Sequence, residues 1–286
     1  MMASRFKAWV AALLAGAALA PGLLCAAEPV MVNVATYNLR LNTDDDGPNA
    51  WPHRREAVKA LIRYHEFDLF GTQEGQPEQI DELAAMTEFA HVGVGRDDGL
   101  RGGEHAAIFY RTSRFGLEIH GDFWLSQTPD RPSKGWDATC CNRIATWARF
   151  ADRSNGRRFY VFNVHFDHQG AVARRESGKL MLRKIKEIAG TAPVICLGDF
   201  NSTPDTEQIH ALSAALTDAY TASRTPPYGP LGTFNGFKLD APMTERIDYV
   251  FVSAPWRVLK YGVLSDSLGG RYPSDHHPVA VRLALD

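Results

Sequence analysis

Short apolar segments with the composition of β-strands recur along almost the whole chain, and they constrain the fold more than any other feature. They are rich in β-branched and aromatic residues, which favour an extended backbone. Segment 194–197 is apolar throughout, which predicts a central strand that is buried on both faces. The predicted strands cover 30–39, 67–71, 106–110, 144–150, 159–165, 194–197, 247–252, 258–263 and 279–285.

A few segments have apolar residues at the spacing of a helix instead. The predicted helices begin at Pro52, cover 79–86 and 172–188, and begin again at Thr203, whose hydroxyl is placed to cap the helix. Many strands with few helices favour two sheets that pack face to face under a cover of helices. We expect them to form one domain that covers residues 28–286.

The N-terminal residues differ from the rest of the chain. Two basic residues precede an apolar run over 8–24, and small residues follow it. This order is typical of a secretory signal peptide, so we expect residues 1–27 to be removed and the mature chain to be periplasmic or secreted. Lipidation of Cys25 is an alternative. A membrane anchor is another, but Pro21 interrupts the run, so no stable membrane span is expected.

The charge of the mature chain argues against one class of function. Removal of the signal peptide takes away two positive charges and moves the formal net charge from −2 to −4. The chain also has no block of lysine or arginine residues, so it lacks the charge pattern of a protein that coats nucleic acid. An enzyme that holds a few phosphates through a metal and one or two arginines stays compatible with this composition.

Three cysteines remain in the mature chain, and an odd number does not indicate a disulfide framework. Cys196 lies in an apolar run and is predicted to be a small buried side chain. A bond between the neighbours Cys140 and Cys141 would be strained. A bond from either of them to Cys196 depends on the distance between the Cα atoms, so the pairing stays open. No cysteine spacing resembles a zinc site.

Polar residues stand at the ends of several predicted strands. Carboxylate, amide and imidazole side chains are costly to bury at such positions unless they are paired or bind a cation. Their recurrence indicates that one edge of the sheets holds a polar site. The residues concerned are Asn38, Glu74, His165, Asp199, Asp248, Asp275 and His276.

These residue types fit one reaction. Carboxylate and amide oxygens suit Mg²⁺ or Mn²⁺, with Ca²⁺ as a third candidate, rather than zinc. A divalent cation offsets the charge that develops when a phosphoester is attacked, and imidazoles move or orient protons near neutral pH. The chain has no serine or cysteine nucleophile motif and no phosphate-binding glycine loop, so attack by water is the simplest mechanism.

Six sequence blocks occur in the order of the signature blocks of the endonuclease/exonuclease/phosphatase superfamily, and the chain resembles this deoxyribonuclease I-like superfamily from about residue 32 to residue 285. The resemblance implies a four-layer α/β/β/α sandwich, in which two packed mixed sheets are flanked by helices and the site lies at one edge. The blocks are Thr-Tyr-Asn-Leu-Arg (36–40), Thr-Gln-Glu (72–74), Asn-Val-His-Phe-Asp-His (163–168), Gly-Asp-Phe-Asn-Ser (198–202), Arg-Ile-Asp-Tyr-Val (246–250) and Ser-Asp-His-His-Pro-Val (274–279).

The resemblance also implies roles around a metal ion. Glu74 matches the principal metal ligand, with Asn38 close to it and Asp275 as a second acidic group near the metal. Asp199 matches the residue that orients or deprotonates the attacking water. Asn201 matches a residue that contacts the phosphate or the transition state.

A further set of matching residues is expected to face the phosphate. His276 resembles the catalytic histidine at the scissile phosphate, with Asp248 as its partner. His165 resembles the second phosphate-facing histidine, with Glu104 as its candidate partner, and Arg143 resembles a phosphate-binding arginine.

The roles of several neighbouring residues stay open. Asp167 and His168 either support the site or contact the substrate. Trp51, His53 and Arg54 either shape the mouth of the site or belong to a helix-capping loop.

The sequence therefore predicts an exported, divalent-metal-dependent phosphoesterase that hydrolyses a phosphodiester or a phosphomonoester. Its partner would be a nucleic acid, a small phosphoester or a lipid headgroup, and its oligomeric state is left undetermined. The acidic composition of the mature chain does not indicate the basic and aromatic groove that binds a nucleic-acid backbone. The alternative is a non-catalytic exported binding protein on the same scaffold. That alternative predicts the loss of signature residues, and all of them are present.

Overall fold

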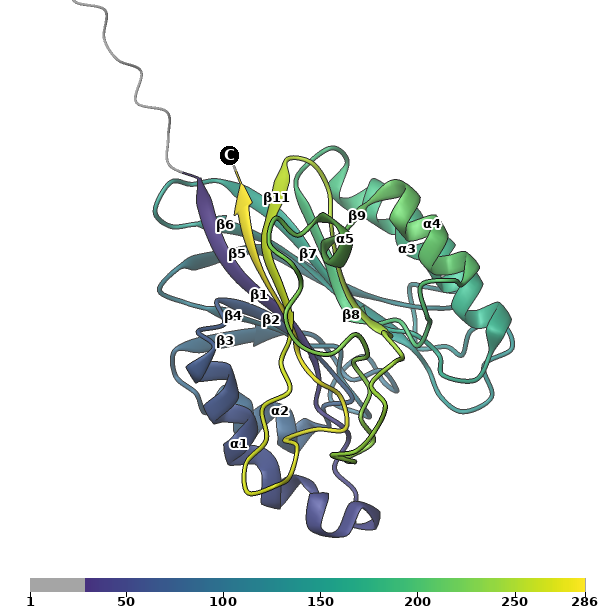
Figure 1. Ribbon diagram of the computed structural model, residues 1–286. Helices are drawn as coiled ribbons and strands as arrows, with labels where there is room; N and C mark the ends of the chain where they lie inside the picture. The colour runs from purple at the N-terminus through teal and green to yellow at the C-terminus, as the bar shows by residue number, and fades with distance from the viewer. Residues whose placement is uncertain (1–28, 286) are drawn as a thin grey trace, which may run out of the picture.

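The computed structural model describes residues 29–285, and the strands of this range form two six-stranded sheets that pack face to face (Figure 1). The predicted signal peptide, residues 1–27, lies outside the described residues. No helix within residues 29–285 combines the length and the apolar character that a membrane crossing requires.

The first sheet has the strand order β11-β12-β1-β2-β4-β3. Strands β1 and β2 pair in parallel, and the other neighbours in this sheet pair antiparallel. The sheet consists of β1 (Val30–Asn38), β2 (Leu69–Gln73), β3 (Phe89–Val92), β4 (Ile108–Arg111), β11 (Trp256–Val263) and β12 (Val279–Leu285).

The second sheet has the strand order β5-β6-β7-β8-β10-β9. Strands β7 and β8 pair in parallel, and the other neighbours pair antiparallel. The sheet consists of β5 (Phe115–Trp124), β6 (Ile144–Asp152), β7 (Arg158–His165), β8 (Val194–Asp199), β9 (Thr217–Asp218) and β10 (Asp248–Val252).

Each sheet contains one β–α–β unit, because a helix joins each parallel pair of strands. Helix α1 (Trp51–Tyr64) joins β1 to β2, after a short 3₁₀ helix η1 (Asp44–Asn49), and α3 (Ala171–Ala189) joins β7 to β8. Two parallel strands end at the same edge of their sheet, so each unit brings two strand ends together there. The predicted site residues Asn38, His165 and Asp199 are the last residues of such strands, and Glu74 follows another directly.

Helices cover the outer face of both sheets. Helices α1 and α2 (Pro77–Ala84) lie on the first sheet, and α3 and α4 (Glu207–Ala215) lie on the second, on opposite sides of the molecule in Figure 1. The short helix α5 (Ala219–Ala222) precedes β10. One apolar core lies between the sheets and another lies beneath each helical layer. The predicted four-layer α/β/β/α sandwich is confirmed.

The strands bury both faces because apolar residues alternate between two cores. In β1, Val32 and Val34 belong to the core between the sheets, whereas Ala35 and Tyr37 belong to the core under α1. Strand β8 does the same, and it lies between β7 and β10 as its fully apolar sequence predicts.

Some elements differ from the sequence prediction. Strand β2 covers Leu69–Gln73 instead of 67–71. The helix predicted at Thr203 begins at Glu207, because the Thr203 hydroxyl donates to Asp205 and residues 203–206 form a turn. Strands β3, β5 and β9 were not predicted. Strand β5 is polar on one face because it is an edge strand whose middle residues are exposed.

Asn163 joins the two sheets through buried hydrogen bonds. Its Nδ2 donates to the carbonyl oxygens of Thr72 and Ala107, each at 2.9 Å, and its Oδ1 accepts from Gln73 Nε2 at 2.6 Å. The sheets approach closely at this point, because a Cβ added to Gly71 would lie 2.2 Å from Leu197 Cδ1. Asn163 therefore fixes how the first sheet lies against the second.

Replacement of this asparagine should destabilise the fold. We expect Asn163→Ala to lower the free energy of unfolding by about 2–3 kcal/mol, because it leaves buried polar groups unpaired and opens a cavity. Denaturant unfolding followed by circular dichroism measures the loss. Asn33→Ala, at a half-buried position of β1 whose side chain donates one exposed hydrogen bond to the carbonyl oxygen of Glu66, is the matched control and should cost well under half as much. Equal losses in the two variants would contradict the assigned role.

Candidate active site

A cavity of about 510 Å³ lies where the strand ends of both sheets meet. Most of the predicted site residues line it directly. Asn38 and Asp248 lie beneath it, and each is hydrogen-bonded to a lining residue. The structure thus brings together every residue that the sequence predicts for the site. The predicted residues on the wall are Glu74, Arg143, His165, Asp199, Asn201, Asp275 and His276.

Asn38 connects the carboxylates of the two sheets. This side chain is fully buried at the end of β1. Its Nδ2 donates to Glu74 Oε1 at 2.9 Å and to Asp199 Oδ2 at 3.0 Å, and its Oδ1 accepts from the backbone N–H of Arg40. One amide therefore fixes the distance between an acidic residue of the first sheet and one of the second.

The backbone turns sharply where these strands end. Arg40, Glu74 and Asn201 have φ angles of 56°, 61° and 45°, in the left-handed region that residues with a Cβ adopt at a cost. Each residue lies within two positions of the end of β1, β2 or β8 and lines the cavity. The turn directs all three side chains into the cavity instead of along the sheet.

His276 and Asp248 form a buried imidazole–carboxylate pair. Nδ1 of His276 lies 2.9 Å from Asp248 Oδ2, and Nε2 lies 3.9 Å from Asp199 Oδ2. Burial lowers the pKa of His276, but Asp248 and then Asp199 and Asp275 raise it more, so the net pKa is well above the ordinary value. The imidazole is therefore protonated at neutral pH.

Asp199 is a fully buried carboxyl group on the wall of the cavity. Burial and the neighbouring charge of Asp248 raise its pKa to about 7. Its Oδ1 accepts from the backbone N–H of Asn201 at 2.8 Å, and Oδ2 lies 3.7 Å from His165 Nε2. A carboxyl group that titrates near neutral pH is suited to taking a proton and returning it.

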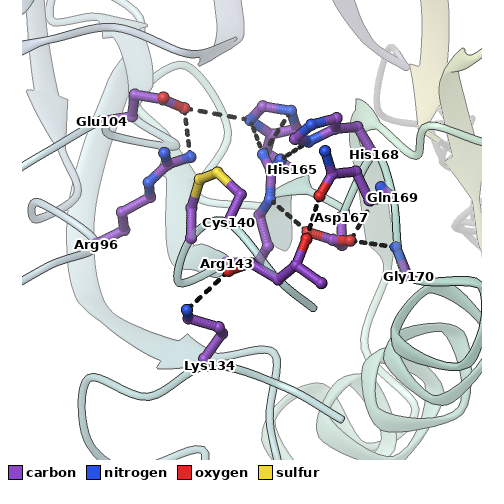
Figure 2. The surroundings of a disulfide bond; sticks show 12 residues. Arg96, Glu104, Lys134, Cys140, Arg143, His165, Asp167, His168, Gln169 and Gly170 are labelled. Carbon is purple, nitrogen blue, oxygen red and sulfur yellow. Dashed lines mark hydrogen bonds and ion pairs between the residues drawn. A yellow bond between two sulfur atoms is a disulfide. The ribbon is translucent and has the colours of Figure 1, made fainter. Parts of the chain in front are cut away.

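Arg143 and two histidines form a second, cationic part of the wall (Figure 2). The guanidinium donates to His165 Nε2 at 2.9 Å and to His168 Nδ1 at 2.6 Å. Burial and the charge of Arg143 hold the pKa of His165 well below its ordinary value, so this imidazole is neutral. Asp167 does not line the cavity. It lies 3.4 Å from Arg143 and accepts the backbone N–H of Gly170, which makes it a supporting residue.

Glu104 pairs with His165 as predicted, at 3.7 Å from Nδ1, and also with Arg96. Arg96 and Arg40 both line the cavity and were not predicted. Arg40 lies within the first sequence block, two residues after Asn38, so the block could have indicated it. Arg96 lies in a loop with no sequence signal.

The oxygen-rich floor of the cavity fits a divalent cation. Donor atoms of Glu74, His165 and Asp199 lie within 4.8 Å of one another, as do those of Asp199, Asp248 and His276. Asp275 adds a further buried carboxyl group, whose pKa is raised by burial and then by Glu74. Several carboxyl groups in one buried site favour a hard cation, and a predominance of oxygen donors suits Mg²⁺, Mn²⁺ or Ca²⁺.

Trp51, His53 and Arg54 do not line the cavity. Arg54 is buried, and its guanidinium donates to the carbonyl oxygens of Leu39, Arg40 and Pro273. It therefore holds the segment after β1 against the segment before β12, both of which carry site residues.

The cysteine pairing, which the sequence left open, is a disulfide between the neighbours Cys140 and Cys141. Both residues line the cavity. Cys196 is free and fully buried, as predicted, and burial raises the pKa of its thiol.

Comparison with known proteins gives consistent matches. A model of the endonuclease/exonuclease/phosphatase family matches residues 35–276. A protein of that family from Bacteroides thetaiotaomicron is 42% identical in sequence, with a TM-score of 0.85, and the match covers 91% of this chain and 99% of that one. A mannosyl-6-phosphatase from the same organism is also 42% identical, with a TM-score of 0.83 and coverage of 88% and 99%.

The matches to curated relatives cover only part of each relative. Nocturnin of Drosophila melanogaster is 31% identical over an alignment of 280 residues that covers 79% of this chain and 41% of that protein. The chain spans between 41% and 59% of the length of the curated relatives that it matches.

Loss of the charge beside His276 should change the pH dependence of any reaction at this site. We expect Asp248→Asn to lower the pKa of His276, because Asp248 is the largest influence that raises it. The alkaline limb of the kcat/KM profile should move to lower pH, and kcat/KM above neutral pH should fall about a hundredfold.

The matched control is the same substitution in an imidazole–carboxylate pair outside the cavity. Asp266 lies 3.1 Å from His65, and neither residue lines the cavity. Asp266→Asn should leave the profile in place. A profile that does not move in Asp248→Asn would contradict the assigned protonation of His276.

Proposed function

Because this chain belongs to the endonuclease/exonuclease/phosphatase family, we propose that it is a divalent-metal-dependent hydrolase of small phosphomonoesters. Members of the family hydrolyse phosphoester bonds, as the sequence prediction requires. The observation that carries the proposal is the contact of Asn38 with both Glu74 and Asp199, next to the His276–Asp248 pair. This arrangement gives a cation ligand, a proton acceptor and a protonated imidazole around one small cavity.

Each group then has one task in the hydrolysis of the ester. Asp199 accepts a proton from the attacking water, since its pKa of about 7 matches that task. The new P–O bond forms from this water, the bond to the leaving oxygen breaks, and the leaving oxygen takes a proton from solvent water to become the alcohol, while Asp199 later releases its proton to solvent. Protonated His276 stabilises the charge that develops on the phosphate oxygens.

Other side chains would bind and orient the phosphate. Arg143 and His168 present N–H groups on the wall, and Asn201 lies next to Asp199. Glu74 and Asp275, with Asn38 beside them, would hold a Mg²⁺ or Mn²⁺ ion, which supplies charge neutralisation at the phosphate.

Three observations favour a small substrate over a nucleic acid. The cavity of about 510 Å³ has the size of a small-molecule site. The chain is also 42% identical to a mannosyl-6-phosphatase, so we propose a sugar phosphate as the substrate. The formal charge of −4 predicted for the mature chain gives no general attraction for a polyanion.

Export through a signal peptide at residues 1–27, to the periplasm or the medium, is part of the proposal. The disulfide between Cys140 and Cys141 supports it, because disulfides persist in oxidising compartments.

Removal of the principal cation ligand should abolish turnover. We expect Glu74→Gln to lower kcat/KM for a sugar phosphate at least about a hundredfold, and EDTA to stop the wild-type enzyme until Mg²⁺ or Mn²⁺ is restored. Phosphate release measures the rate. Glu118→Gln, at a glutamate that pairs with Arg149 and Arg158 outside the cavity, is the matched control and should stay active.

A substrate panel separates the alternatives. It compares mannose 6-phosphate, bis-p-nitrophenyl phosphate, sphingomyelin, RNA and plasmid DNA with Mg²⁺, Mn²⁺ and Ca²⁺. Faster cleavage of plasmid DNA or RNA than of mannose 6-phosphate would show that the protein is a nuclease and not a sugar phosphatase. Cleavage of none of these compounds would favour a non-catalytic binding protein on the same scaffold.

A further inference from the structure

We propose that the disulfide between Cys140 and Cys141 is an apolar recognition surface for the alcohol part of the substrate, and that it favours phosphoesters of a sugar ring over those of a short open-chain alcohol. This proposal rests on the proposed function, in which the phosphate binds at Arg143. It goes beyond that function because it assigns a specificity-determining element to this chain.

The two cysteines lie in the connection between β5 and β6 and line the same cavity as His165 and Asp199. Cys140 is exposed and Cys141 is half-buried, and both residues line the cavity. Figure 2 shows the disulfide among Arg96, Arg143 and His165. The alcohol part of an ester whose phosphate contacts Arg143 would therefore extend along the disulfide.

Stability of the fold does not account for this bond. A disulfide stabilises a protein mainly by closing a loop in the unfolded chain, and the effect grows with loop length. Cys140 and Cys141 are neighbours in sequence, so their bond closes almost no loop. Both cysteines instead contribute surface to the wall of the cavity.

The segment that carries the disulfide is held in place on several sides. The backbone N–H of Leu125 donates to Arg143 at 2.7 Å, and Asn142 Nδ2 donates to the carbonyl of Arg96 at 3.2 Å. The Thr139 hydroxyl bonds to Gln169, just before α3. A surface fixed in this way before binding loses little freedom when a ligand packs on it.

The chemistry of the cavity gives the disulfide its selectivity. Most of the wall is charged or imidazole, whereas the two sulfur atoms and their Cβ atoms form a polarisable surface without strong hydrogen-bonding groups. The C–H face of a pyranose ring can pack on such a surface by dispersion. Phe234 is a further apolar group of the cavity, beside Leu41 and Ile247; it is 41% exposed, and its ring centroid lies 5.1 Å from that of His276. A short open-chain alcohol offers no flat face to either.

Equilibrium binding of phosphonates tests this inference without turnover. The two probes are the phosphonate analogue of mannose 6-phosphate and ethylphosphonate, and calorimetry with the full chain and Mg²⁺ gives both Kd values. The wild type should bind the ring-bearing probe more tightly. In Cys140→Ala/Cys141→Ala, the ratio of the two Kd values should fall roughly fivefold, because apolar contact with the ring is lost.

The ratio removes effects on the phosphate end, since any disturbance of Arg143 or His276 weakens both probes alike. Leu231→Ala is the matched control, because Leu231 is an exposed apolar side chain that does not line the cavity. Its ratio should equal that of the wild type. If the double variant does not fold in a thermal denaturation assay, Cys140→Ser replaces it, with a smaller change in the same direction.

Two results would overturn the inference. One is a wild type that binds both probes equally, and the other is a folded cysteine variant with an unchanged ratio. A wild type that prefers the ring-bearing probe but hydrolyses no phosphomonoester would refute the proposed phosphatase activity and leave the recognition surface standing.

Discussion

The pair of hydrogen bonds that the Asn38 amide donates to Glu74 and Asp199 is the interaction on which the site depends. The two carboxylates belong to different sheets, and their like charges would separate them without a donor between them. The sheets themselves are fixed by apolar packing and by Asn163, which donates from the second sheet to carbonyls of the first. The geometry of the site is therefore a property of the sheet interface as a whole.

Burial gives three groups in one cavity different protonation states. His276 is protonated because Asp248 lies against it, whereas His165 is neutral because burial, and then the charges of Arg143 and Arg96, lower its pKa. The pKa of Asp199, which lies between them, is raised to about 7. Groups of similar intrinsic character thus acquire separate roles from their neighbours, as acid–base catalysis requires.

The sequence predicts the layers well, because central strands are buried on both faces and are therefore apolar throughout, as in segment 194–197. It predicts the strand-end residues of the site for the same reason, since a polar residue after an apolar strand stands out. The sequence does not predict β5, because the middle residues of this edge strand are exposed and lack the apolar pattern of a strand. It places the start of a helix too early at Thr203, because the Thr203 hydroxyl donates to Asp205 in a local turn. It does not find Arg96, which enters the cavity from an irregular loop, and it could not choose the Cys140–Cys141 bond from spacing alone.

The left-handed backbone of Arg40, Glu74 and Asn201 has a consequence for the evolution of the chain. Glycine would relieve the backbone strain of each of these turns, but it would also remove a side chain from the cavity. Selection for thermal tolerance and selection for turnover therefore oppose each other at these positions. Variants of this protein that tolerate heat best should have gained their stability elsewhere, in the helical layers and surface loops.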